Sequence, residues 1–202
     1  MLHRLFAGHT FIGLVVRMNI KALFEEKDKE QAEEIIANTI LFNSSIRYED
    51  VPILIEKAYE KFEIAIGYVD TFAVDYVIAL FASDADKHPV LGKNRYIILK
   101  KGIDIKVRRY ILALAMCDYL YSDDDIEYIA AYTENYMTEH DNIKAARTAR
   151  ALLIPQKSLS TLLFSPMLSK ADDTEKISSV ETAFLVPNEI ASERMRETGI
   201  LD

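Results

Sequence analysis

The chain has 202 residues, a formal net charge of −8 and one cysteine, and half of its residues are hydrophobic. This length and apolar content suit one compact domain with a sizeable core, and they argue against wholesale disorder. The negative charge opposes non-specific binding to nucleic acid or to an anionic membrane, because both require a positive surface field. The lone Cys117 cannot form an internal disulfide, which indicates a reducing compartment, and we therefore expect a cytoplasmic protein.

Residues 1–17 differ from the rest of the chain. They begin with basic residues and continue into an apolar stretch, residues 5–16, that a Gly-His-Thr run interrupts. This stretch is shorter than the about 20 apolar residues that span a bilayer, and no small-residue cleavage site follows it. A signal or anchor is the alternative to our interpretation, in which the domain begins at Met18 and the preceding residues are a misassigned start or a loosely docked arm. Residues 18–202 then form a single domain.

The first half of that domain combines helices and strands. Apolar residues at helical spacing predict a helix from Asp28 to about residue 44, and Asp50 with Pro52 marks the start of a second helix. Strand character follows in residues 64–69, 75–83 and 95–101. The turn-rich segment between the last two suits a hairpin or longer loop. We therefore expect a small antiparallel sheet in a part of the domain that ends at about residue 101.

The second half is predicted to be helical, and one of its helices, in the segment DNIKAARTARALLIP, is expected to stop before Pro155. Residues 105–121 are apolar on most sides, as expected of a helix buried in the middle of a domain. The C-terminal part, residues 123–202, starts with an aspartate run that we interpret as a helix cap rather than a cation site, because the other oxygens of a calcium loop are missing. On that next predicted helix, Tyr128, Tyr132 and Tyr136 form one stripe, which indicates packing rather than a ligand platform.

Three segments of the second half match the pattern of one family in order and spacing. In residues 94–121, Arg109, Tyr110, Leu112 and Ala113 are in step with the pattern RFTLAHELGHYLL. The segment ARTARALLIP matches through Ala145, Ala149, Leu152, Leu153 and Pro155. The tail SSVETAFLVPNEIASERMRETGIL matches through Phe184, Val186, Ala191, Arg194, Met195 and Gly199. The chain thus resembles the ImmA/IrrE family of metallopeptidase-like proteins.

The resemblance implies an α+β fold: a mainly helical zincin-like domain with a small antiparallel sheet and a C-terminal helix-turn-helix-like element. It also shows where the chain departs from the family. The family's H-E-x-x-H motif places two zinc ligands and a general base on one helix. Here these positions hold Leu114, Ala115 and Asp118, and Asn142 stands where the family has its acidic third ligand. Residues 102–126 contain no His and no Glu, so no shift in register restores the motif.

A substitute metal site is an open alternative. His140 and Asp141 precede Asn142, and Asp118 is positioned to face them across the core. Adjacent residues on a helix point about 100° apart, however, so His140 and Asp141 do not both replace Asn142. The other histidines, His3, His9 and His88, are interpreted as surface or incidental residues. Cys117 sits in an apolar run without a nearby histidine, which is typical of an inert buried thiol.

The C-terminal tail is similar to the second half of a helix-turn-helix, with Arg194 and Arg196 expected on its exposed side. In a DNA-binding version, such arginines contact phosphates or guanine edges. Three glutamates at i, i+4 and i+8 share the helix and either oppose phosphate or pair with the arginines: Glu189, Glu193 and Glu197. We therefore expect packing or partner docking, and we do not expect binding to DNA.

Together these features predict a catalytically inactive, regulatory protein-binding module that uses no cofactor and does not act at a membrane. The resemblance implies that its partner is a helix-turn-helix repressor of a phage or mobile element. The alternative is a divergent zinc metallopeptidase that cleaves such a repressor with relocated ligands, and only that alternative needs zinc.

Overall fold

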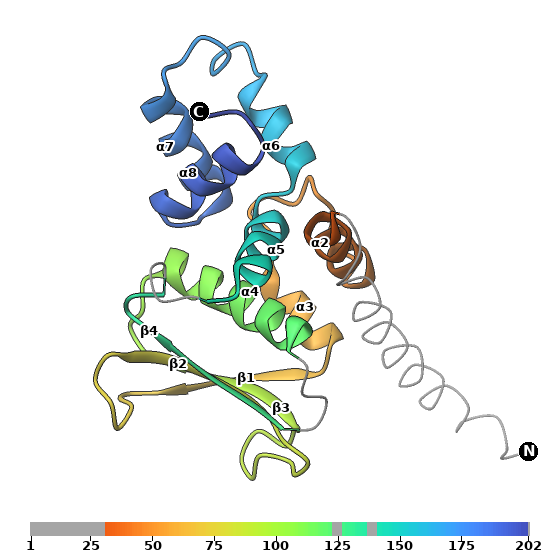
Figure 1. Cartoon of the computed structure of the whole chain (residues 1–202), viewed down its shortest axis with the longest axis vertical. Helices are drawn as coiled ribbons and strands as arrows, with labels where there is room; N and C mark the ends of the chain where they lie inside the picture. Colours follow the sequence, from red (N-terminus) through yellow and green to blue (C-terminus); the bar gives the residue numbers. More distant parts are fainter. Residues whose placement is uncertain (1–30, 123–126, 137–140, 202) are drawn as a thin grey trace, which may run out of the picture.

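The computed structural model describes residues 31–122, 127–136 and 141–201. This part of the chain is mixed α+β, with seven helices and a four-stranded sheet. The predicted arm at residues 1–17, the aspartate run at 123–125 and His140 lie outside the described residues. In Figure 1 the sheet forms the lowest layer, helix α4 crosses its upper face, and the other helices lie on that same side.

The helices agree with the predicted pattern in most places. They are α2 (Ala32–Asn43), α3 (Ile55–Lys61), α4 (Ile105–Tyr121), α5 (Ile143–Leu153), α6 (Gln156–Leu163), α7 (Asp173–Phe184) and α8 (Asn188–Glu197). Helix α3 begins later than predicted, because the Asp50 carboxylate accepts a hydrogen bond from the Arg47 amide, 3.3 Å away, and so closes a turn instead of capping a helix. The helix predicted to stop before Pro155 does so.

The prediction of an antiparallel sheet is wrong in one respect. The strands are β1 (Ile64–Val69), β2 (Val77–Ser83), β3 (Arg95–Lys100) and β4 (Tyr128–Thr133), in the spatial order β1-β3-β2-β4. Strands β2 and β3 form the expected antiparallel hairpin, but β1 pairs with β3 in parallel. The sheet is therefore mixed, because the short connection after β1 places β2 on the far side of β3 instead of beside β1.

Residues 128–133 were predicted as a helix and are instead strand β4, paired antiparallel with β2. Residues at i and i+4 share a face in a strand as well as in a helix, so the tyrosine spacing does not distinguish the two. The aromatic and β-branched content of YIAAYT favours the strand. Tyr128 and Tyr132 both point toward α4, and the Tyr128 ring lies 6.0 Å from the Phe81 ring, so the prediction that these tyrosines pack inward is confirmed.

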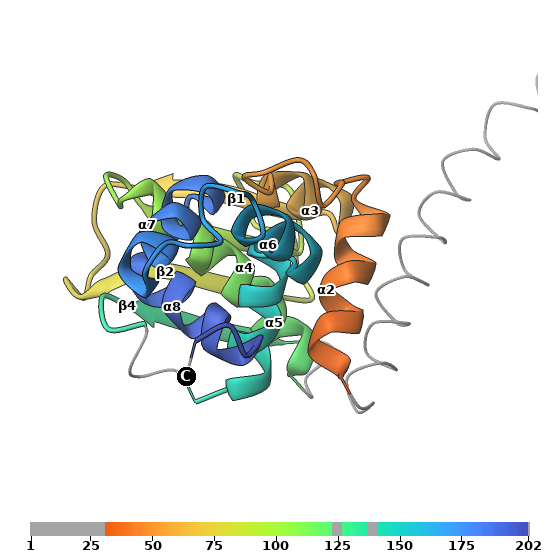
Figure 2. The ribbon, with the colours of Figure 1, turned by 90° about the horizontal axis from the view of Figure 1, so that it is seen from above.

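Helix α4 is the centre of the core. Its first turn is capped by the Asp104 side chain, which accepts hydrogen bonds from the amides of Lys106 at 2.8 Å and Val107 at 3.4 Å. From Arg109 to Leu120 every residue is buried. Seen from above in Figure 2, α5, α7 and α8 lie over α4, while α2 flanks α5. Within the described residues, no helix combines the length and the apolar character needed to cross a bilayer.

Candidate functional site on helix α4

Helix α4 is fixed to its surroundings through backbone carbonyls. The buried Arg109 guanidinium donates to the carbonyl of Ile53 at 2.6 Å and to that of Leu185 at 3.1 Å. The Tyr59 hydroxyl donates to the Leu112 carbonyl at 2.8 Å. These bonds join α4 to α3, to the segment before it, and to the turn after α7. The middle of α4 therefore has a defined position between the sheet and the helical layer.

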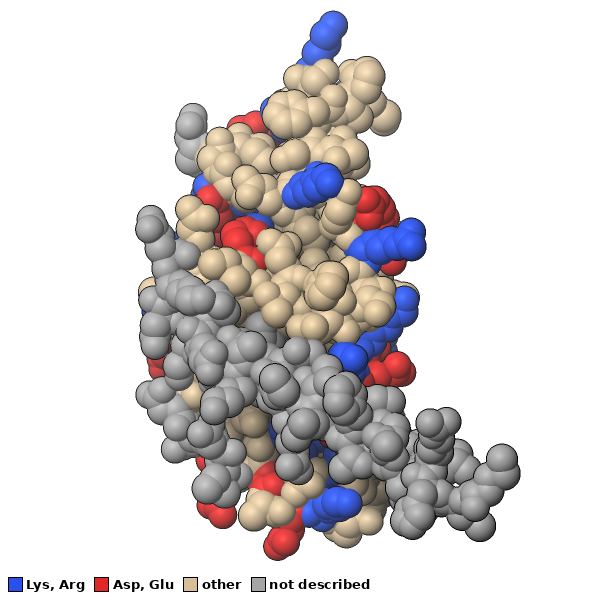
Figure 3. All heavy atoms as spheres, turned by 90° about the vertical axis from the view of Figure 1, so that its right-hand side faces the viewer, with Lys and Arg blue, Asp and Glu red and all other residues tan. Residues whose placement is uncertain are grey.

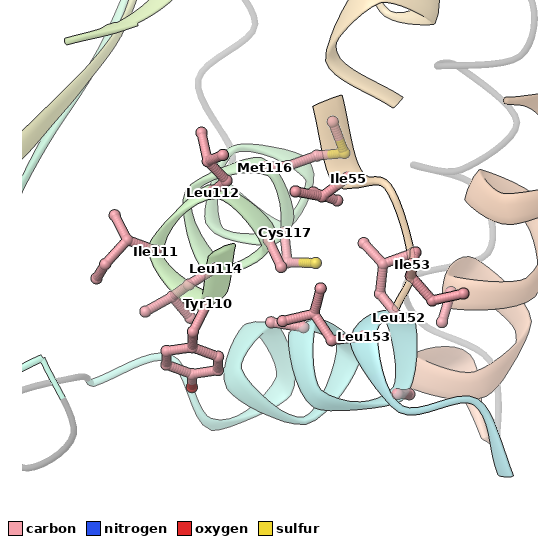
Figure 4. Packing of buried hydrophobic residues seen from close by; sticks show 14 of the residues in the cluster. Ile53, Ile55, Tyr110, Ile111, Leu112, Leu114, Met116, Cys117, Leu152 and Leu153 are labelled. Carbon is pink, nitrogen blue, oxygen red and sulfur yellow. The ribbon is translucent and has the colours of Figure 1, made fainter. Parts of the chain in front are cut away.

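The two positions where the resembled family has a zinc ligand and a general base are part of the apolar core. Leu114 and Ala115 are both 0% exposed. Figure 4 shows Leu114 on α4 among buried side chains of the cluster, with α5 packed beside it. Neither residue has a lone pair for a metal or a group that takes up a proton.

Cys117 lies one turn further along α4 and is also fully buried. In Figure 4 its sulfur points toward the side chains of Ile53 and Leu153. Burial raises the pKa of the thiol well above its ordinary value, and the neighbouring Asp118 carboxylate raises it further. Because the thiolate is the reactive form, burial and the raised pKa both disfavour reactivity at this cysteine.

Of the three α4 residues aligned with the resembled H-E-x-x-H pattern, Asp118 is the one with a metal-binding atom. It is 6% exposed, and its Oδ2 accepts a hydrogen bond from the Tyr132 hydroxyl at 2.9 Å. Burial, and then the Asp118 charge, raise the pKa of Tyr132 well above its ordinary value. The same two causes, in the same order, raise the pKa of Tyr128 to about 12. The Tyr132 phenol therefore stays protonated and donates to the carboxylate.

The sequence did not identify Tyr132 as the partner of Asp118, because it placed Tyr132 on a helix after α4. In the structure, strand β4 pairs with β2, and this pairing turns Tyr132 toward α4. The signal that was present is the strand-forming composition of residues 128–133.

Asn142, which stands where the family has its third ligand, caps helix α5. Its Oδ1 accepts a hydrogen bond from the Ala145 amide at 3.1 Å. The Tyr132 hydroxyl holds the Asp118 carboxylate from β4, so the two side chains are occupied by different partners. An amide oxygen that already accepts a capping hydrogen bond is a poor zinc ligand, because zinc prefers His, Cys and carboxylate ligands.

The residues of α4 and α5 do not fit a zinc ion. Among the described residues, no three His, Cys, Asp or Glu side chains come together in a way that could hold a metal. His88 lies in the β2–β3 loop, where its Nδ1 accepts hydrogen bonds from the amides of Val90 and Leu91, both at 3.2 Å. The imidazole of His88 therefore helps to stabilise the β2–β3 loop in which it lies.

Arg194 is not on the exposed side of its helix, and this expectation was wrong. It is 4% exposed, donates to the Ile154 carbonyl at 3.1 Å and forms an ion pair with Glu34 of α2. Its long stem places the guanidinium between α8, α5 and α2. Arg196 does lie at the surface, where it pairs with Glu193 at 2.7 Å. The predicted pairing of the tail arginines with its glutamates is therefore present.

A hollow of about 310 Å³ lies beside the first turns of α4. Its lining includes four apolar or aromatic side chains and three charged ones: Ile78, Ile103, Val107 and Tyr136, with Lys100, Lys101 and Glu134. Two of the charged groups are already engaged, since Lys101 pairs with Asp70 at 2.9 Å and Lys100 donates to the Asp75 carbonyl at 3.2 Å. The apolar floor and the Glu134 side chain are the parts of the lining that these contacts leave open to a ligand.

Charges on the coloured part of the surface in Figure 3 are mixed, with Lys and Arg side chains among Asp and Glu side chains rather than in one basic field.

Comparison with protein-family models, with curated proteins and with solved structures found no match to this chain.

Proposed function

We propose that this chain is a non-catalytic regulatory module that acts by binding another protein. The observation that carries the proposal is the chemistry of the α4 positions. Leu114 and Ala115 are wholly buried and apolar, and the carboxylate of Asp118 accepts its hydrogen bond from Tyr132. A hydrolytic site needs a ligand set and a base at these positions, and the side chains present supply neither.

The apolar substitutions have a physical reason. Buried imidazole and carboxylate groups without a metal would need new hydrogen-bond partners, and leaving them unpaired costs several kcal/mol. Leucine and alanine remove that need and let the domain fold on packing alone. The remaining polar group of the motif, Asp118, keeps a partner from β4.

The resemblance supports a helix-turn-helix repressor of a phage or mobile element as the partner, in a cytoplasmic setting. Two described surface features suit protein binding. One is the apolar floor of the hollow beside α4, which has room for one or two large side chains of a partner. The other is Arg196 on α8, whose side chain is half exposed and paired only at the surface.

The test first asks whether the adjacent reading frame encodes a small helix-turn-helix protein, and then purifies that protein together with the full chain. We expect the two to co-purify, and we expect the purified chain to contain no stoichiometric zinc. The substitution Val107→Lys should weaken the complex, because it places a charge on the floor of the hollow. The matched control Ile143→Lys, at an exposed position on α5, should leave the complex unchanged.

Two results would contradict the proposal. Failure of the chain to bind that neighbour removes the assigned partner. Stoichiometric zinc that is lost on Asp118→Ala or His140→Ala, together with cleavage of the repressor, would establish the divergent metallopeptidase instead.

A further inference from the structure

Another hollow, of about 370 Å³, lies among helices α6, α7 and α8, which Figure 1 shows on the side of the molecule away from the sheet. One of its walls is a single face of α6, where Gln156, Ser160 and Leu163 follow one another at helical spacing and Phe164 ends the helix. The other walls come from the first turn of α7, from the turn before it and from the residues that follow α8. Its lining residues differ from those of the hollow beside α4.

The wall that follows α8 has a well-defined backbone. Gly199 has a φ of 69°, in the left-handed region in which many helices end. Its amide donates to the Arg196 carbonyl at 3.0 Å, and the Ile200 amide donates to the Met195 carbonyl at 2.9 Å. These bonds occupy carbonyl oxygens in the last turn of α8, so the turn that forms this wall is fixed to its helix.

The lining combines an apolar part with one cation. Leu163, Phe164 and Ile200 supply the apolar part. Phe164 is 81% exposed, so its ring has room to pack against a bound molecule. Lys176 is the one charged residue among the described residues that line the hollow, and the remaining polar ones are uncharged: Gln156, Ser160, Ser169 and Thr198.

The Lys176 ammonium has a distant partner in the structure. Its side chain is 23% exposed, and its ion pair with Asp173, at 3.7 Å, is longer than a hydrogen bond. The Asp173 side chain is 70% exposed, so water screens its charge. The ammonium can therefore donate to a further acceptor, and a carboxylate forms stronger hydrogen bonds with it than a neutral group does.

We propose that this hollow binds a small organic acid with one carboxylate and an apolar chain. The carboxylate pairs with Lys176, and the chain lies against Leu163, Phe164 and Ile200. A cavity of about 150 Å³ holds one benzene ring, so the 370 Å³ of this hollow have room for roughly fifteen non-hydrogen atoms. An acid of about eight to twelve carbons therefore fits.

Ligands of other charge fit the hollow less well. A cationic ligand meets the Lys176 ammonium, and a zwitterion needs an acidic group, which the described lining residues do not supply. A neutral apolar molecule gains only the contact with the apolar wall. The charge of the lining therefore selects the carboxylate.

The test is a titration of the full chain, followed through its NMR amide signals, with three probes that share an eight-carbon chain: octanoate, octylammonium and 1-octanol. We expect octanoate to shift the signals of Ser160, Lys176 and Ile200 and to saturate in the millimolar range or below, as its size allows. Octylammonium and octanol should bind about tenfold more weakly, since neither accepts a charge-assisted bond from Lys176.

Two pairs of variants locate the site. Lys176→Met keeps the apolar stem and should weaken octanoate binding about tenfold without changing octanol binding. Its control, Lys170→Met, removes an exposed lysine outside the lining and should change neither. Phe164→Ala should weaken octanoate and octanol alike, because it removes part of the apolar wall. Its control, Phe42→Ala, at a position on α2 that is 83% exposed, should leave both unchanged.

Three results would overturn the proposal. The first is equal binding of octanoate and octylammonium, and the second is octanoate binding that Lys176→Met leaves unchanged. The third is the lack of saturable shifts at Ser160, Lys176 and Ile200. None of these results depends on a partner protein, so they leave the protein-binding function to its own test.

Discussion

Helices α4 and α8 both pack against α5, but they are held there by different forces. On α4 the contact is apolar, with Leu114 and Ala115 fully buried. On α8 the contact is made by a buried cation, Arg194, which reaches the Ile154 carbonyl and pairs with Glu34. Apolar packing tolerates changes of chemistry if volume is kept, whereas hydrogen-bonded ions require a fixed geometry. The apolar α4 contact therefore depends mainly on the volume that its side chains fill, while the α8 contact fixes how three helices meet.

The largest expected effect concerns the apolar packing of helix α4. Leu114→Ala should lower the free energy of unfolding by about 4 kcal/mol, because it removes buried methyl groups and leaves a cavity. Urea denaturation measures the change. The control Ile143→Ala removes a side chain that is 65% exposed and should cost well under half as much. Equal losses for the two variants would show that α4 is not tightly packed.

The second-largest expected effect tests the contact that the buried Arg194 makes on helix α8. Arg194→Met keeps the apolar stem but removes the donors to Ile154 and the partner of Glu34. We expect a loss of about 3 kcal/mol, less than for a fully enclosed pair because the Glu34 side chain is 32% exposed. Arg196→Met is the matched control and should change stability by less than about 1 kcal/mol, since its pair with Glu193 lies at the surface. A similar loss for both arginines would contradict the burial of Arg194.

A smaller loss of stability is expected when the hydrogen bond to Asp118 is removed, since this residue is a buried polar group on the mostly apolar helix α4. Tyr132→Phe keeps the aromatic packing and removes the hydroxyl that donates to the carboxylate. We expect a loss of about 2 kcal/mol, which denaturation can measure, because a buried charged acceptor loses a hydrogen bond. Tyr76→Phe, at a position that is 61% exposed, should be nearly neutral. If Tyr132→Phe is equally neutral, the hydrogen bond to Asp118 does not contribute.

The smallest effect concerns a polar contact between α4 and α7. The hydrogen bond from Lys106, at 2.6 Å, and then that from Asn188, hold the pKa of Glu181 below its ordinary value. A carboxyl with a lowered pKa stabilises the fold above its unfolded-state pKa and loses this contribution as pH falls through the folded-state value.

Lys106→Gln should therefore cost under about 1 kcal/mol at pH 7 and progressively less as the pH falls below about 4.5. Denaturation curves at several pH values measure this convergence with the unaltered chain. Lys176→Gln, whose partner Asp173 is 3.7 Å away and mostly exposed, serves as the control and should show no such convergence. A pH-independent cost for Lys106→Gln would mean that the ion pair does not stabilise the α4–α7 contact.

Prediction from the sequence succeeded where one local pattern decides the structure. The apolar run at residues 105–121, the hairpin around residues 84–94 and the helix that ends before Pro155 all formed as expected. It failed at Tyr128–Thr133, because a four-residue spacing of tyrosines fits a helix and a strand equally well. It also failed at Arg194, because helical periodicity does not show where a long side chain meets other elements.

The sequence by itself determined that Leu114 and Ala115 lack the groups of a zinc hydrolase, since that follows from residue type alone. It also determined the apolar character of residues 5–16. Only the tertiary structure decided that Asp118 has a partner on β4, that Arg194 is interior, and that β1 pairs with β3 in parallel. Each of these depends on which strands pair and which helices meet, and such long-range contacts depend on packing between segments far apart in the chain.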